Sequence, residues 1–206
     1  MTDLVVVGRS SSHFTRTVRI FALELGVPHR FEPVFDLTVL DAGAYAGNPA
    51  LKVPVLVTGD GPLFGTENIC RELVRRSGRG AEVVLRGAVA DRRVANAEEL
   101  VLHAMSTEVS LIVAQLAGDA RLAPAKLERS LDGSLRHLDD HLDDALAALP
   151  APRRLSFLEV AVFCLVTHLP FRKIRSIDRH PRLVEFCRQF GARAGARATE
   201  YAFDQP

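Results

Sequence analysis

Three short segments carry residue types and spacings that could do chemistry. "GRSSSHFTR" places Ser10, Ser11 and Ser12 directly before a predicted helix, where serine is a good cap and its hydroxyl is also a hydrogen-bond donor. "KVPVL" places Pro54 inside an apolar run typical of a buried strand, although proline cannot donate to the sheet ladder. A cis bond is one reason for such a proline. "GTENI" puts Thr66 at the start of another predicted helix.

Two histidines with metal-ligand spacing form a further candidate. His137 and His141 stand four residues apart among aspartates, so both could lie on one face of a helix. The same pattern fits a solvated face beside a leucine stripe, which is the commoner arrangement, and we predict no metal site. Cys70, Cys164 and Cys187 are far apart in apolar surroundings, which indicates reduced core residues of a cytosolic protein.

The elements that must position the three segments are short strands and helices in residues 1–77. The predicted strands are LVVV, HRFEPV, VPVLV and PLF, and the predicted helices are HFTRTVRIFALELG and TENICRELVRR. A strand–helix–strand unit implies a parallel pair with a right-handed crossover, and the turn TGDGP adds an antiparallel hairpin. The result is a four-stranded mixed sheet with helices on its faces. The three segments could meet near one end of its strands.

Beyond a linker-like stretch at residues 77–82 the sequence predicts helices and no strand. Two apolar stripes at helical spacing indicate two long helices, the first ending at Gly118 and the second starting near Pro124. The stripe residues are Val94, Ala97, Val101, Met105, Val109, Ile112 and Leu116, then Leu127, Leu131, Leu135, Leu138, Leu142 and Leu149. Ser156 and Glu159 form a capping-box pattern before an apolar run. We therefore expect an α/β domain over residues 1–77 and an all-helical bundle over residues 84–206.

Composition narrows the class of partner. The chain has 206 residues, 48% of them hydrophobic, and 26 Lys+Arg against 25 Asp+Glu give a net charge of +1. This balance argues against nucleic acid, because phosphate binding usually leaves a basic excess. The N-terminal apolar run is too short for a signal peptide, and the most apolar segment has about half of the roughly 20 residues that a membrane span needs. We expect a cytoplasmic protein that binds no membrane.

Four segments together resemble the cytosolic glutathione transferases: "SHFTRTVRI", "NPALKVPVL", "GTENI", and the pair "LSFLEVA" and "HPRLVEFCRQF". These proteins have a thioredoxin-like domain followed by an all-helical domain. The resemblance places the serine-type catalytic position at Ser12, with Ser11 or Ser10 as the alternatives. Its hydroxyl would donate a hydrogen bond to the thiolate of glutathione. A free thiol has a pKa of about 8.5, so such a bond favours the nucleophilic form.

The resemblance also assigns the peptide-holding groups. It implies a cis Val53–Pro54 bond whose free main-chain groups pair with the cysteinyl part of glutathione. Thr66 would hold the γ-glutamyl carboxylate at a helix start, and Lys52 would face the glycyl carboxylate. The family usually has an acidic residue just before the Thr66 position, where this chain has Gly65; Glu67 is close but lies on the next step of the helix.

The resemblance implies a homodimeric detoxification enzyme that adds glutathione to an electrophilic, apolar substrate. A glutathione-dependent isomerase or dehalogenase would share the site. A non-catalytic relative that binds a small molecule or a protein is the alternative, and Gly65 favours it. No cysteine lies within residues 9–15, so chemistry through a mixed disulfide with the protein is not expected.

Overall fold

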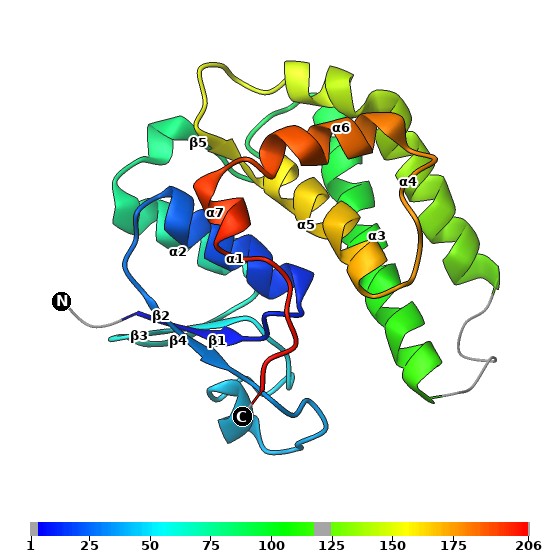
Figure 1. The fold of residues 1–206 in the computed structure, drawn as a ribbon. Helices are drawn as coiled ribbons and strands as arrows, with labels where there is room; N and C mark the ends of the chain where they lie inside the picture. The colour runs from blue at the N-terminus through cyan, green and yellow to red at the C-terminus, as the bar shows by residue number, and fades with distance from the viewer. Residues whose placement is uncertain (1–3, 118–124, 206) are drawn as a thin grey trace. The chain divides into compact units, whose positions relative to one another are not determined.

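The computed structural model describes residues 4–117 and 125–205. The chain divides into two compact units, one with the residues up to Val83 and from Ala192 onward, the other with Val84–Gly191 (Figure 1). The predicted helix end at Gly118 and helix start near Pro124 lie outside the described residues.

The first unit contains the four-stranded mixed sheet that the sequence predicts. Its strands are β1 (Val5–Gly8), β2 (Arg30–Pro33), β3 (Val55–Thr58) and β4 (Gly61–Phe64). They lie in the order β2-β1-β3-β4, with β1 parallel to β2 and antiparallel to β3, and with β3 and β4 forming an antiparallel hairpin. The predicted thioredoxin-like topology is therefore confirmed.

Both faces of this sheet are covered. Val5, Val7 and Val55 belong to an apolar cluster against which Ala46 packs, just after the short 3-10 helix η1 (Ala42–Tyr45). Side chains alternate across a strand, so Val6 points to the opposite face. The helices α1 (His13–Glu24) and α2 (Thr66–Ser77) pack against that opposite face and against each other (Figure 1).

The C-terminal segment belongs to the first unit, whereas the sequence analysis placed it in the helical domain. Its short helix α7 (Ala194–Arg197) packs on α1. Glu24, buried on α1, accepts hydrogen bonds from the Gly195 amide at 2.8 Å and from Arg193 Nη2 at 2.6 Å. These polar contacts join residues about 170 positions apart, which a reading of local pattern does not reveal.

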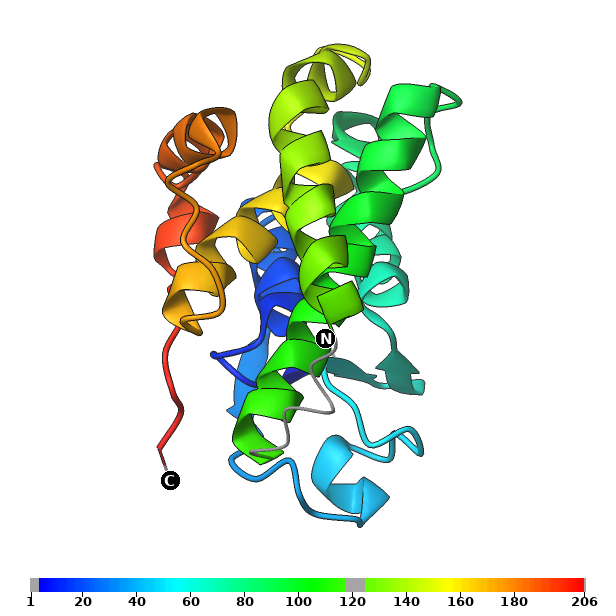
Figure 2. The ribbon, with the colours of Figure 1, turned by 90° about the vertical axis from the view of Figure 1, so that its right-hand side faces the viewer.

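The second unit is the predicted helical bundle. Its helices are α3 (Arg92–Ala117), α4 (Ala125–Ala147), α5 (Phe157–Phe171) and α6 (Pro181–Phe190). The long helices α3 and α4 lie side by side, and α5 packs against both α3 and α6 (Figure 2). By length and composition alone, α3 could cross a membrane; core helices of soluble proteins pass the same test, and Val101 and Met105 of α3 are buried in the bundle.

Two details of this unit differ from the sequence prediction. The strands β5 (Val83–Val84) and β6 (Leu155–Ser156) pair as a two-stranded sheet where no strand was expected, because two residues are too few to show alternation. The predicted stripe on α3 is also partly wrong, since Val109 is 41% exposed and Leu116 is 78% exposed.

The helical period puts Glu108 into the core in place of its neighbour Val109. Glu108 on α3 is fully buried, and its Oε1 lies 2.8 Å from Nδ1 of His168 on α5, whose side chain is 3% exposed. A buried carboxylate needs a polar partner, and the His168 imidazole lies at ion-pair distance from it. One half of the predicted capping box is confirmed: Ser156 Oγ accepts from the Glu159 amide at 3.1 Å, and the Glu159 carboxylate accepts from the Ser156 hydroxyl at 2.7 Å.

Candidate functional site

The serine segment connects the end of β1 to the start of α1. Gly8 ends the strand, and a Cβ there would lie 2.5 Å from Cγ2 of Thr15, so glycine lets the first turn of α1 approach the sheet. Ser12 is the N-cap of α1, and its Oγ accepts a hydrogen bond from the Thr15 amide at 3.3 Å. Capping uses the hydroxyl as an acceptor and leaves its proton available. Ser12 donates to no acceptor within residues 4–117 and 125–205, and it is half-buried.

The other two serines are more fully engaged. Ser11 is only 6% exposed and lies inside the unit. Ser10 Oγ accepts a hydrogen bond from Arg19 Nη1 at 3.3 Å, and its amide donates to Asp204 Oδ2 at 2.8 Å. Ser10 and Ser12 are both half-buried, but Ser10 Oγ is already engaged by Arg19, so Ser12 is the candidate whose hydroxyl is not engaged by another side chain within the described residues.

The Val53–Pro54 peptide bond is cis. It precedes β3, so Val53 lies outside the sheet ladder. In the part of the chain that the structure describes, the Val53 amide and carbonyl form no hydrogen bond. The Val53 side chain packs against the apolar cluster that contains Val5, Val7 and Val55. Lys52 beside it is exposed, and its carbonyl accepts from Asn48 Nδ2 at 2.7 Å. This hydrogen bond from Asn48 thus fixes the main chain directly before Val53.

Helix α2 begins without a side-chain cap. Gly65 is the N-cap, at a φ of +88°, and Thr66 is the first helical residue, in agreement with its predicted place at the helix start. That φ is in the region that favours glycine, which gives a backbone reason for Gly65. The first-turn amides of a helix lack intrahelical partners and attract anions. Glu67 follows in the first turn, 3.9 Å from Arg71.

The three segments emerge at the same end of the sheet. In the antiparallel register Val7 pairs with Val55, and Val55 pairs with Phe64. The end of β1, the start of β3 and the end of β4 are therefore neighbours, which confirms that the predicted segments share one sheet end. Adjacent strands are about 4.8 Å apart, so β1 and β4 are separated by roughly 10 Å. An extended tripeptide spans about that distance.

The charged groups beside the serine segment were missed by the sequence analysis. Arg16 and Arg19 lie on α1, and Asp204 comes from the C-terminal tail. Burial lowers the pKa of the Arg19 guanidinium, whereas the nearby Asp204 carboxylate raises it. Two arginines on α1 were the available signal, and no local pattern pointed to residue 204.

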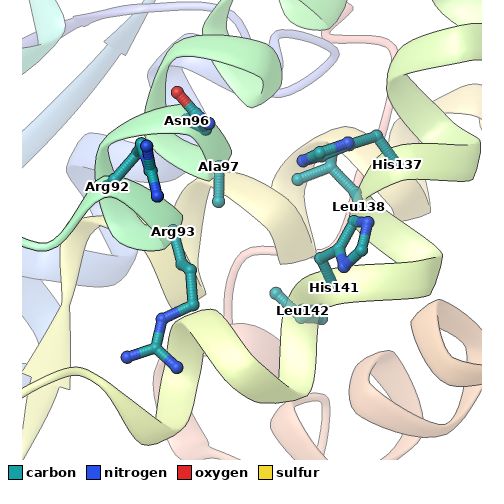
Figure 3. A pocket seen from close by; sticks show the side chains of 8 residues that line it. All are labelled: Arg92, Arg93, Asn96, Ala97, His137, Leu138, His141 and Leu142. Atoms are coloured by element: carbon teal, nitrogen blue, oxygen red, sulfur yellow. The ribbon is translucent and has the colours of Figure 1, made fainter.

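The second unit contains a small separate cavity of about 180 Å³ between α3 and α4 (Figure 3). His137 and His141 line one side with their rings 4.5 Å apart, and Arg92, Arg93 and Asn96 line the other. Arg93 is already paired with Asp91 at 2.8 Å. Two guanidinium groups opposite the imidazoles disfavour a bound cation, in keeping with the solvated-face interpretation of this histidine pair.

Comparison with known proteins identifies the class. Residues 11–76 match the family described as glutathione S-transferase, N-terminal domain. The thioredoxin-like sheet followed by a helical unit is also the fold of glutathione transferases of known structure, so the resemblance that the sequence predicts is supported for the N-terminal domain and for the fold. All three cysteines are buried and none of them forms a disulfide, in agreement with the expectation of core residues.

The relatives share the whole length of the chain. YibF of Escherichia coli K12, described as an uncharacterized GST-like protein, is 27% identical over 202 residues, covering 95% of this chain and 97% of the relative. A glutathione S-transferase of Methylobacillus flagellatus KT with glutathione bound has a TM-score of 0.79 at 20% identity, covering 97% and 100% of the two chains. A glutathione transferase family member of Pseudomonas fluorescens Pf-5 with bound glutathione has a TM-score of 0.77, 20% identity and the same coverage.

Proposed function

We propose that this protein is a glutathione transferase that activates the thiol of glutathione for attack on an electrophilic, largely apolar substrate. The observation that carries the proposal is the shared sheet end, where the half-buried N-cap hydroxyl of Ser12 and the unpaired main chain of Val53 come from adjacent strands. Solved proteins with this fold bind glutathione, which supports glutathione as the co-substrate.

Ser12 acts as a hydrogen-bond donor and does not itself become a nucleophile. A hydrogen bond to a charged group contributes about 1.5–3 kcal/mol, which corresponds to roughly one to two pKa units for the bound thiol. The positive end of the α1 dipole acts in the same direction. The thiol proton leaves to solvent, and the thiolate forms the new carbon–sulfur bond with the electrophile. In a substitution the leaving group departs to solvent with its bonding electron pair, and in an addition the pair from the broken double bond takes up a proton from solvent. Binding both reactants side by side supplies the remaining acceleration.

The remaining groups hold the peptide. The Val53 amide and carbonyl pair with the cysteinyl main chain like an added strand. Thr66 and the uncapped amides of α2 receive the γ-glutamyl carboxylate, and the exposed Lys52 receives the glycyl carboxylate. Gly65 offers no carboxylate to the α-ammonium group, and Glu67 is the nearest acid on α2.

A non-catalytic glutathione-binding or interaction protein is the second candidate, favoured by Gly65 at the position where the family usually has an acid. It uses the same peptide-holding groups and leaves the thiol unactivated.

One experiment separates the two. We expect the purified protein to bind glutathione in calorimetry and to conjugate it to a generic aromatic electrophile, with kcat/KM at least tenfold lower in Ser12→Ala. Ser11→Ala, which changes the buried neighbour, is the matched control. Binding without turnover supports the second candidate. If the wild-type protein does not bind glutathione, both candidates fail.

A further inference from the structure

The C-terminal tail reaches the serine segment through a single carboxylate. Asp204 Oδ2 accepts a hydrogen bond of 2.8 Å from the amide of Ser10, which lies 194 residues away in the chain and two residues before Ser12. Both belong to the first unit. We infer that Asp204 is a positioning residue, which holds the serine segment so that the Ser12 hydroxyl is aimed at the thiol. This inference rests on the proposed function of Ser12.

Ser10 is held from a second side by α1. Arg19 Nη1 donates to Ser10 Oγ at 3.3 Å, and the Arg19 guanidinium stacks on the Phe31 ring of β2, 4.2 Å from its centroid. The amide and the hydroxyl of Ser10 are thus both engaged, one by the tail and one by the helix. Burial lowers the pKa of the Arg19 guanidinium, and the Asp204 carboxylate lies close enough to offset part of that lowering, so the tail and the helix are electrostatically linked.

The course of the tail toward Asp204 is fixed by Arg16, which is 5% exposed on α1. Its Nη2 donates to the Ala196 carbonyl at 3.1 Å, and its Nε donates to Thr199 Oγ1 at 3.4 Å. The Tyr201 ring covers the same guanidinium at 4.2 Å. The tail therefore runs from α7 along α1 with an anchor at every second or third residue (Figure 1). Asp204 is the last of these anchors.

The connection between β1 and α1 is only four residues long, Arg9–Ser12, so a shift of Ser10 is transmitted to Ser12. Catalytic hydrogen bonds are sensitive to displacements of about 1 Å, which cost up to roughly a hundredfold in rate. Val53 and Thr66, which hold the peptide, lie on other segments and form no hydrogen bond with Asp204 within the described ranges. Loss of the Asp204 contact should therefore lower kcat and leave glutathione affinity nearly unchanged.

The test uses the full chain and three variants. Asp204→Ala removes the acceptor, whereas Asp204→Asn keeps an amide oxygen that can still accept from the Ser10 amide. Gln205→Ala changes the exposed neighbour and is the matched control. Conjugation kinetics, calorimetric binding of glutathione, and the ultraviolet absorbance of the bound thiolate as a function of pH are measured for each. Hydrogen exchange of the Ser10 amide reports the contact directly.

In Asp204→Ala we expect kcat to fall about tenfold, the dissociation constant of glutathione to change less than twofold, the pKa of the bound thiol to rise, and the Ser10 amide to exchange faster. Asp204→Asn should retain most of the activity, and Gln205→Ala should match the wild type. An active wild type whose Asp204→Ala variant keeps its kcat and thiol pKa overturns this inference alone, as does parallel loss of kcat and affinity. A wild type that does not bind glutathione overturns the proposed function as well.

Discussion

Two serines cap helices in the two units, and they differ in what the hydroxyl does next. In the first unit Ser12 accepts from the Thr15 amide and, within the described residues, donates to nothing. In the second unit Ser156 accepts from the Glu159 amide and also donates to its carboxylate. Two serines with the same capping role therefore differ in their hydroxyl protons: that of Ser156 is donated to a carboxylate, and that of Ser12 is not donated to any acceptor in the described residues. A capping serine is a candidate site only where its hydroxyl proton is not already donated to an acceptor of the protein.

The contrast extends beyond the caps. In the helical unit the most buried polar groups close on each other, as Glu108 and His168 do at 2.8 Å inside the bundle. In the thioredoxin-like unit the main chain of Val53 forms no hydrogen bond within the described residues, and α2 begins without a side-chain cap. Buried polar groups serve the structure in both units, as Glu24 does with Gly195 in the first, and the first unit in addition keeps polar groups available at one end of its sheet. The predictions below test each half of this contrast.

The largest expected effect is a loss of stability when the Glu108–His168 pair is broken. Glu108→Ala removes the carboxylate beside the buried His168 imidazole, and breaking a buried pair by deleting one partner costs about 3–5 kcal/mol. We expect the free energy of unfolding, measured by urea denaturation, to fall by about that amount.

Two further variants make this measurement specific. Gln115→Ala, an exposed change on the same helix, should cost less than about 0.5 kcal/mol. Replacing both partners by leucine should recover much of the loss, because the uncompensated polar group is then gone. A Glu108→Ala variant as stable as Gln115→Ala would contradict the structural role assigned to the pair.

The two serines themselves give the next largest effect. Ser12→Ala and Ser156→Ala each remove an N-cap and should each destabilise the protein by about 1 kcal/mol in thermal or urea unfolding. Only Ser12→Ala should also reduce conjugation, because only its hydroxyl is open to a ligand. If Ser156→Ala lowered kcat/KM as much as Ser12→Ala at equal stability, the distinction between open and closed caps would be wrong.

Two glycines, one in each unit, allow a further comparison of the two units by their effect on stability. Gly65 starts α2 at a φ of +88°, so Gly65→Ala should destabilise the protein by about 1 kcal/mol. Gly133 lies within α4, where an added Cβ would meet nothing within 4 Å, so Gly133→Ala should stabilise it by about 0.5–1 kcal/mol. The check is the sign of the change in unfolding free energy, which should be opposite for the two variants.

The features that the sequence predicts are those encoded by neighbours in the chain. The capping box at Ser156, the hairpin turn after β3 and the proline at residue 54 are local patterns, and the strand order follows from rules of connection. Glu108 was passed over because a charged residue interrupts an apolar stripe, although its helical position faces the core. Asp204 could not be found because its partner is 194 residues away. The role of Ser12 stays a prediction.

The smallest expected effect concerns surface carboxylates, again one in each unit. The hydrogen bond from Arg75 and the further bond from Arg76 lower the pKa of Glu72 on α2 to about 2. A lowered folded-state pKa contributes stability above the unfolded value of about 4.3, and this stability is lost as the pH falls toward 2. Glu72→Gln should therefore cost at most about 1 kcal/mol at pH 7 and nothing near pH 2.

The matched carboxylate on α6 is Glu185, whose pKa is also lowered to about 2 by hydrogen bonds from Arg188 and then Gln189. Its side chain is 50% exposed, against 18% for Glu72, so solvent screens its ion pair more strongly. Urea unfolding between pH 2 and pH 7 should show a smaller pH-dependent loss for Glu185→Gln than for Glu72→Gln. An equal or larger loss at Glu185 would mean that burial does not set the strength of these pairs in the two units.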